Sequence, residues 1–110
     1  MKAKVEIEAG ICGFKTACTA TCEDSQNVTF SIESDCEKIR KFAEALKAKG
    51  EIDAFQEINA KGESVILTTA RESLKGCCSA CAAAIGVFKS MQVAAGLALP
   101  KDIRIGMSKE

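Results

Sequence analysis

Apolar and polar residues alternate along the first third of the chain. The alternation runs through residues 5–11, 14–23 and 27–33. A period of two places every second side chain on one face, so each stretch predicts a half-buried strand. Asp24 breaks the second run with a charge, and residues 24–27 are typical of a turn. Three strands joined in this way predict a three-stranded antiparallel meander with one face open to solvent.

The pattern changes to helical spacing at Ser34. Ser34 and Glu37 form a capping-box sequence, in which each side chain can bind the backbone N–H of the other residue. An apolar stripe follows and ends at Lys49-Gly50, which is typical of a helix C-terminus. We therefore expect a helix that opens after Ser34 and carries Cys36 at its second position.

Two shorter helices are expected in the middle of the chain. Residues 51–60 have the spacing of one short helix. Residues 64–75 favour another, although residues 65–68 by themselves would also suit a strand. The residues expected to face inward from all the helices are Ile39, Phe42, Ala43, Leu46, Ile52, Phe55, Ile58, Ile66, Ala70, Leu74, Ile85, Phe88, Met91, Ala95 and Leu99.

The last part of the chain predicts a long helix and then a strand. The helix should run from about residue 79 to 99, where Pro100 stops it. Apolar residues alternate again within 102–108, which predicts a short closing strand. Strands, then helices, then one strand, with no linker between them, predict a single α+β domain of residues 1–110, with the helices packed on one face of a small sheet.

Composition narrows the range of functions. The chain has 110 residues, 15 basic and 15 acidic side chains, no Trp and no Tyr, so a nucleic-acid partner is not expected. No stretch is long and apolar enough for a membrane span or a signal peptide, so we expect a cytoplasmic protein. With no histidine and no glycine-rich phosphate loop, the sequence gives no support for hydrolytic or phosphoryl-transfer catalysis, and an enzyme is not indicated.

Seven cysteines are the chemically informative residues. Cys12 lies between Gly10 and Gly13, at the expected corner between the first two strands. Cys36 lies at the start of the first helix, and helix N-termini favour thiolate over thiol. Three more cysteines lie around the expected start of the last helix, with Cys81 near its second position, and either of two spacings could supply a ligand pair: Cys77, Cys78 and Cys81.

Clustered cysteines in a reducing compartment are more often ligands or catalysts than disulfides. We therefore expect Cys12, Cys36 and Cys81, with Cys77 or Cys78 as a fourth ligand, to hold an iron–sulfur cluster or an all-thiolate zinc ion. The remaining two cysteines, Cys18 and Cys22, share the apolar face of the second strand and are expected to be packing residues.

This cysteine layout resembles that of the NifU-like iron–sulfur scaffold family. Cys12-Gly13 resembles the first cysteine motif of that family, Cys36 the second, and Cys78 or Cys81 the third. The order of cysteines also resembles the TSCPD domain, and the chain as a whole resembles an uncharacterised family of anaerobic bacteria and archaea. The resemblance implies metal or cluster binding and a protein partner that exchanges clusters or electrons.

The chain also departs from the scaffold family. Gly13-Phe14-Lys15 lacks the acidic residue that follows the first cysteine in that family, and the histidine beside the third cysteine is absent. Leu99-Pro100-Lys101 follows the last helix, whereas the docking segment of the family precedes the cysteine. These departures leave thiolate ligation as the shared property.

Several alternatives stay open at this point. The same cysteines could form a structural zinc site in an interaction module. Cys78 and Cys81 could instead act as a thiol–disulfide pair, although the order of strands and helices is not that of a thioredoxin-like protein. All seven cysteines could also be reduced and inert. The metal, the cluster type and the oligomeric state, including a homodimer with shared ligands, are not determined by the sequence.

Overall fold

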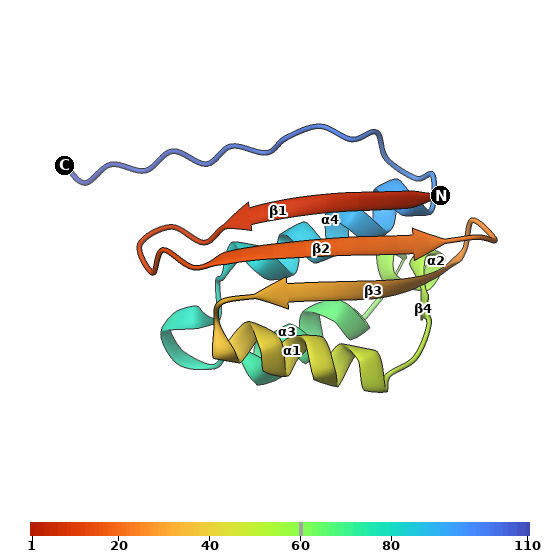
Figure 1. Cartoon of the computed structure of the whole chain (residues 1–110), viewed down its shortest axis with the longest axis horizontal. Coiled ribbons are helices and arrows are strands. Elements are labelled where there is room, and N and C mark those ends of the chain that lie inside the picture. The colour runs from red at the N-terminus through yellow and green to blue at the C-terminus, as the bar shows by residue number, and fades with distance from the viewer. Residues whose placement is uncertain (60) are drawn as a thin grey trace.

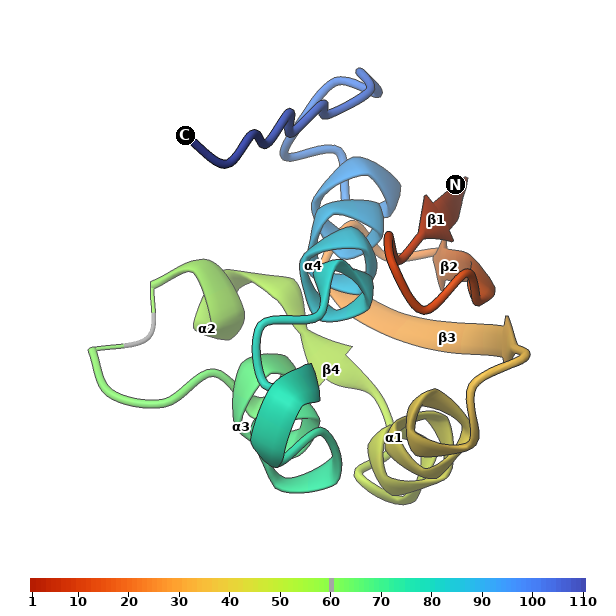
Figure 2. The ribbon, with the colours of Figure 1, turned by 90° about the vertical axis from the view of Figure 1, so that its left-hand side faces the viewer.

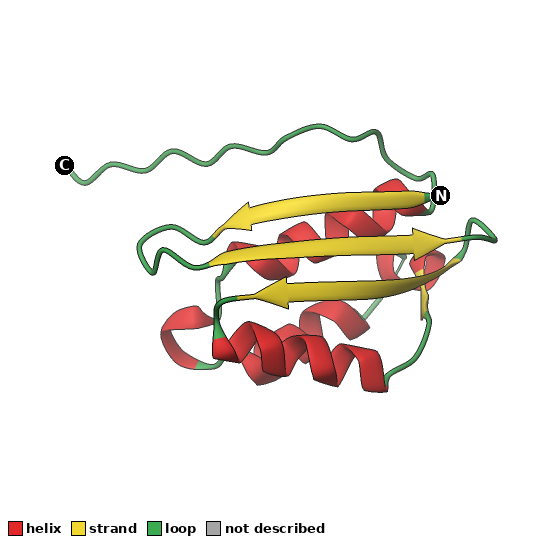
Figure 3. Ribbon diagram, in the orientation of Figure 1, coloured by secondary structure: helices red, strands yellow, loops and turns green. Residues whose placement is uncertain are grey.

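In the computed structural model, four strands form one sheet and the helices gather beside it (Figures 1 and 3). The structure describes residues 1–59 and 61–110, and the side chain of Cys77 lies outside the described part. The strands are β1 (Lys2–Glu8), β2 (Lys15–Cys22), β3 (Asn27–Ser34) and β4 (Ile52–Asp53). The helices are α1 (Glu37–Ala48), α2 (Ala54–Ile58), α3 (Val65–Ser73), the short 3-10 helix η1 (Gly76–Cys78) and α4 (Ala82–Ala94).

The predicted α+β class and the antiparallel meander are confirmed. The sheet has the order β1-β2-β3-β4, and each neighbouring pair is antiparallel. Val5 pairs with Cys18, and Cys18 pairs with Ile32, so the apolar positions of the three long strands lie side by side. The helix expected at residues 64–75 is also confirmed, as α3, and the described part contains no helix that is long and apolar enough to cross a membrane.

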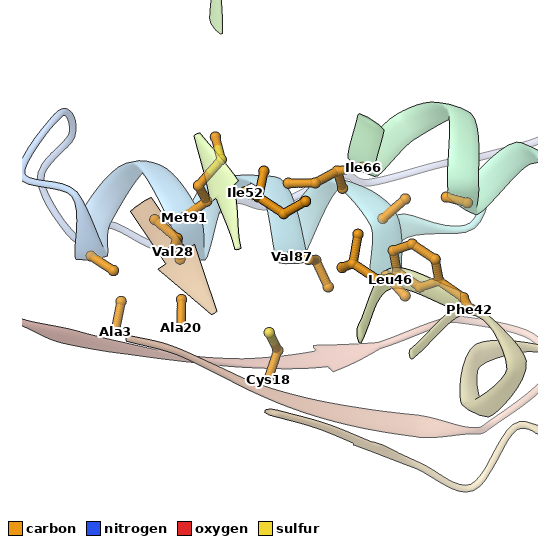
Figure 4. Close-up of a cluster of buried hydrophobic side chains, with 14 of the residues drawn as sticks. Ala3, Cys18, Ala20, Val28, Phe42, Leu46, Ile52, Ile66, Val87 and Met91 are labelled. Carbon is orange, nitrogen blue, oxygen red and sulfur yellow. The ribbon is translucent and has the colours of Figure 1, made fainter. Parts of the chain in front are cut away.

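The core lies between the sheet and the helices. Helix α4 packs on β1 and β2, α1 packs on β3 and α3, and α3 also contacts α4. Figure 4 shows Ala3, Cys18 and Ala20 pointing from the sheet toward the helices. At Gly86 the helix α4 comes so near to β1 that an added Cβ would lie 2.4 Å from Cδ1 of Ile7. Glycine at this position therefore allows α4 to lie close against the edge of the sheet.

Several expectations about the later helices and the C-terminal segment are wrong. Helix α4 spans Ala82–Ala94, so it is shorter at both ends than the predicted helix at 79–99 and stops before Pro100. The closing strand predicted at 102–108 is not formed, since residues 101–110 have no regular structure and are exposed. Burial also differs from the expected apolar face: the exposed fractions are 43% for Phe55, 40% for Ile58, 49% for Ile85 and 88% for Leu99.

The capping box predicted at Ser34 and Glu37 is also wrong. The helix begins at Glu37 with Cys36 as its N-cap, so Cys36 precedes the helix instead of occupying its second position. Ser34 is the last residue of β3, and its Oγ accepts a hydrogen bond from the backbone N–H of Cys36 at 3.1 Å. The same hydroxyl is hydrogen-bonded to Thr16 at 2.8 Å. Pairing of β3 with β2 holds Ser34 in the sheet, and the helix therefore starts two residues later than expected.

Candidate metal centre

The sheet topology brings the first two cysteine groups to one end of the molecule. Strand β1 ends at Glu8 and β2 begins at Lys15, so Cys12 lies in the loop between them. Strand β3 runs antiparallel to β2, and Ser34 at its end pairs with Thr16 near the start of β2. The end of β3 therefore lies beside the loop that carries Cys12, and Cys36 comes two residues after that end. Figure 1 shows this loop and the start of α1 at the left of the sheet.

Helix α4 brings the third group to the same end. Gly86, in its first half, approaches Ile7 near the end of β1, and Ser90, one turn later, lies 3.6 Å from the sulfur of Cys18. The start of α4 therefore lies beside the end of β1. A hydrogen bond also joins α1 to the segment before η1: the ammonium group of Lys38 donates to the backbone carbonyl of Lys75 at 3.1 Å. Figure 2 looks directly at this region.

We call this region the cysteine end and define it by its four described cysteines: Cys12, Cys36, Cys78 and Cys81. Cys12 is exposed, whereas the other three are partly buried and pack against the hydrophobic core. The predicted ligand Cys77 belongs to η1, but its side chain is outside the described part.

The loop that carries Cys12 is a tight turn. The backbone N–H of Gly13 donates to the carbonyl of Gly10 at 2.9 Å, and the N–H of Ala9 donates to the carbonyl of Phe14 at 3.2 Å. Gly10 and Gly13 have φ angles of +92° and +71°, which residues with a side chain rarely adopt. This backbone leaves the Cys12 thiol on the surface, as the flanking glycines suggested.

Both long helices that begin at the cysteine end begin with a cysteine. Cys36 is the N-cap of α1 and Cys81 is the N-cap of α4, and neither helix start has a side-chain capping hydrogen bond. The first N–H groups of a helix have no partner within the helix and favour a negative charge nearby. A thiolate at an N-cap is suitably placed to receive that stabilisation. The expectation that both cysteines lie at helix starts is confirmed, with each one at the cap position.

Cys78 and Cys81 lie on the two sides of a single turn. The backbone N–H of Cys81 donates to the carbonyl of Cys78 at 3.0 Å, which closes the turn that leads into α4. Both thiols are free. The turn keeps the two residues close together, as either a ligand pair or a dithiol requires.

The potential ligands are near one another in the fold but are not arranged around one point. Within the described part of the chain, no group of three or more Cys, Asp and Glu side chains is placed to hold a metal ion. All six described cysteines are free thiols. Metal binding by Cys12, Cys36 and Cys81 together would therefore require their side chains to move.

The other two cysteines behave as predicted and belong to the core. Cys18 and Cys22 have exposed fractions of 0% and 2%. Burial raises the pKa of the Cys18 thiol to about 11, and the hydrogen bond with Ser90 only partly opposes this effect. Cys22 donates to Asp24 at 3.7 Å. Since a thiol must lose its proton to bind a metal, Cys18 is poorly suited to ligation.

A buried carboxylate, Glu57, was not anticipated from the sequence. It has an exposed fraction of 6% and accepts hydrogen bonds from the Ser64 hydroxyl at 2.7 Å and from the backbone N–H groups of Val65 and Ile66, each at 2.8 Å. These are the first residues of α3, so Glu57 neutralises the start of that helix. Its hydrogen-bonding capacity is used within the fold, and Glu57 is therefore a structural residue.

Comparison with known proteins identifies one family. Residues 3–107 match a family of unknown function, DUF6951. The chain belongs to this family. The match includes the described helices, all seven cysteines and the whole sheet apart from Lys2 of this DUF6951 protein. It matches no curated protein and no solved structure.

Proposed function

We propose that this DUF6951 protein binds a metal centre through thiolates at the cysteine end, and that the centre is an iron–sulfur cluster used in cluster transfer or electron transfer with a protein partner. The observation that carries the proposal is the arrangement of three separate cysteine groups at one end of the sheet. Two of these groups include the N-cap of a helix whose start has no side-chain cap. An inert domain has no need for that arrangement.

Cys12, Cys36 and Cys81 would be the core ligands, and Cys77 or Cys78 would supply the fourth. Four thiolates hold either an iron–sulfur cluster or a tetrahedral zinc ion, and the cluster would supply one-electron chemistry. The N–H groups at the starts of α1 and α4 would stabilise the negative charge of the sulfurs. The reducing interior of a cell, where thiols persist, is the compartment that suits this function.

A thiol–disulfide protein is the second candidate, and the turn between Cys78 and Cys81 favours it. Oxidation would join the two sulfur atoms and release two protons and two electrons to an acceptor protein. Such a dithiol would bind no metal tightly. The exposed Cys12 loop and the Cys36 helix start would have no role in this reaction, which is why we prefer the metal centre.

The deciding experiment is an absorption spectrum with elemental analysis of protein purified without oxygen. A brown protein with a broad visible band and equal amounts of iron and sulfide would support the cluster. A colourless protein with stoichiometric zinc would assign a zinc site, and a metal-free protein would contradict the proposal.

Matched variants locate the site. Cys36→Ser and Cys81→Ser should lose most of the metal, because each removes a core ligand. Cys22→Ala, which changes a buried packing cysteine, should retain metal in proportion to the folded protein. If the serine variants keep the metal content of the wild type, the proposed ligands are wrong.

A further inference from the structure

We infer that the C-terminal segment of residues 101–107 docks on the open edge of β1 as a fifth strand, parallel to β1 and in the same molecule. The inference is independent of the proposed metal centre. In the present structure this segment belongs to no strand.

The segment has the side-chain pattern of a strand without the sheet. Ile103, Ile105 and Met107 alternate with polar residues and glycine, and their exposed fractions are 57%, 73% and 93%. Strict alternation is typical of a strand with one buried face. In the described structure, residues 101–110 are exposed and belong to no strand. Three apolar side chains on one face of an extended segment thus lack a partner surface.

Strand β1 offers such a surface. It pairs with β2 on one side and is the outermost strand of the sheet on the other. An edge strand presents a row of N–H and C=O groups that another strand can pair with. The inward-facing Ala3 and Ile7 are buried, and Val5 between them is only partly buried. An added strand would extend this apolar face beyond Val5.

The segment runs in the required direction. Figure 1 shows it beyond the free edge of β1 and running the same way as β1, and Figure 2 shows it passing over α4. Helix α4 ends with the N–H of Leu97 donating to the carbonyl of Gln92 at 2.8 Å, close to the start of β1. The connection from Gly96 to Lys101 can span up to about 18 Å, whereas adjacent strands are about 4.8 Å apart.

Charges select one parallel register. Placing Ile103 beside Val5 and Ile105 beside Ile7 keeps the apolar residues on the inner face. The same register puts Asp102 beside Lys4 and Arg104 beside Glu6, so both neighbouring pairs have opposite charges.

A shift by two residues would weaken this match. It would place Ile103 beside Ala3 and bring Arg104 next to Lys4, where like charges repel, and only Asp102 beside Lys2 would remain a pair of opposite charges. At present Lys4 and Glu6 form only an exposed ion pair with each other at 3.9 Å, so both are free to exchange partners.

Docking within the same molecule is favoured over docking on a second copy. A short flexible connection gives the segment an effective concentration in the millimolar range. A separate molecule would reach that level only at comparable protein concentrations. The short connection after α4 also delivers the segment in the parallel direction.

Amide hydrogen exchange of the full chain, measured by NMR, tests this inference. Alternate amides within 102–107 should exchange at least about tenfold more slowly than in a free peptide of the same sequence. The protection should not depend on protein concentration. Arg104→Glu should abolish it, because the introduced carboxylate would face that of Glu6, and exchange at β2 and α4 reports that the domain stays folded.

The reciprocal exchange of charges provides the strict control. Glu6→Arg combined with Arg104→Glu should restore protection, whereas Lys109→Glu, which lies beyond the proposed ladder, should leave protection unchanged. Unprotected amides in the wild type, or no recovery in the double variant, would overturn the inference. Protection that appears only as a dimer forms in sedimentation experiments would overturn docking in the same molecule and assign the edge to a second copy.

Discussion

The two ends of the sheet are constructed in opposite ways. At the end where β2 turns into β3, Asp24 accepts hydrogen bonds from the N–H groups of Gln26 at 2.9 Å and Asn27 at 2.7 Å. Nearby, Asp53 caps α2 by accepting from the N–H of Phe55 at 2.9 Å. At the cysteine end, α1 and α4 begin at Cys36 and Cys81 with no side-chain cap.

This difference indicates where the molecule retains unused chemistry. At the end where β2 turns into β3, Asp24 and Asp53 use their carboxylate oxygens to accept hydrogen bonds from the backbone, so these side chains contribute to stability. The start of α3 is similar, because Ser64 and Glu57 together bind its N–H groups. At the cysteine end, the first N–H groups of α1 and α4 have no side-chain cap and the thiols are free. These N–H groups are therefore available to stabilise thiolates that bind a metal. We therefore propose that the function resides at the cysteine end.

The largest expected effect is a difference in thiol reactivity. Cys18 and Cys22 in the folded protein should react with iodoacetamide about a thousandfold more slowly than Cys12, because the buried thiols become accessible only when the domain opens. The raised pKa of Cys18, about 11, slows that residue further. Mass spectrometry of peptides after timed labelling measures the ratio.

Labelling in concentrated urea is the control, and there the rates should become similar. Fast modification of Cys18 or Cys22 in the folded state would remove the distinction between core cysteines and those of the cysteine end.

A smaller effect concerns the stability of the helix starts. Glu57→Ala should lower the free energy of unfolding by about 2–3 kcal/mol, since two buried donors and one partly buried donor lose a charged acceptor. Glu63→Ala, at an exposed position in the segment between α2 and α3, should change it by less than about 0.5 kcal/mol. Urea unfolding of metal-free, reduced protein measures both.

The helix starts at the cysteine end should respond in the opposite direction. In metal-free protein, Cys36→Ser should leave stability unchanged or raise it by about 0.5–1 kcal/mol, because serine is a better N-cap than an uncapped thiol. A marked loss of stability would mean that Cys36 is required for packing, and the contrast between the two kinds of helix start would fail.

The smallest expected effect is the acid sensitivity of the β2–β3 turn. Hydrogen bonds from Asn27, through its backbone and side chain, and from the backbone of Gln26 lower the pKa of Asp24 from 3.8 to about 2. Because the folded pKa is depressed, this contribution to stability is complete above about pH 4. It is lost as the pH falls through 2.

Asp24→Asn should therefore lose stability less steeply than the wild type between pH 5 and pH 2. Glu23→Gln, at the neighbouring exposed position, is the control and should follow the wild-type curve. Equal acid slopes for Asp24→Asn and the wild type would show that the turn is not held by the ionised carboxylate.

Sequence-based predictions succeeded where interactions between residues close in the sequence decide the structure, and they failed where tertiary contacts decide it. The meander could be predicted because alternation and turn residues act over a few positions, and the buried pair Cys18 and Cys22 followed from the same period. The capping box failed because pairing of β3 with β2 keeps Ser34 in the sheet. The expected inward position Ile85 failed because the face that α4 buries depends on where it crosses the sheet, and Leu99 failed because α4 ends at Ala94.

The sequence by itself determined the class of fold, the two structural cysteines and the types of residue available for chemistry. These depend on local periodicity and composition. Only the tertiary structure decided that Cys12, Cys36, Cys78 and Cys81 share one end of the molecule, because their proximity depends on antiparallel strand pairing and on the direction of α4. It also decided that the helix starts there lack caps, since capping depends on which neighbouring side chains the fold brings within hydrogen-bonding distance.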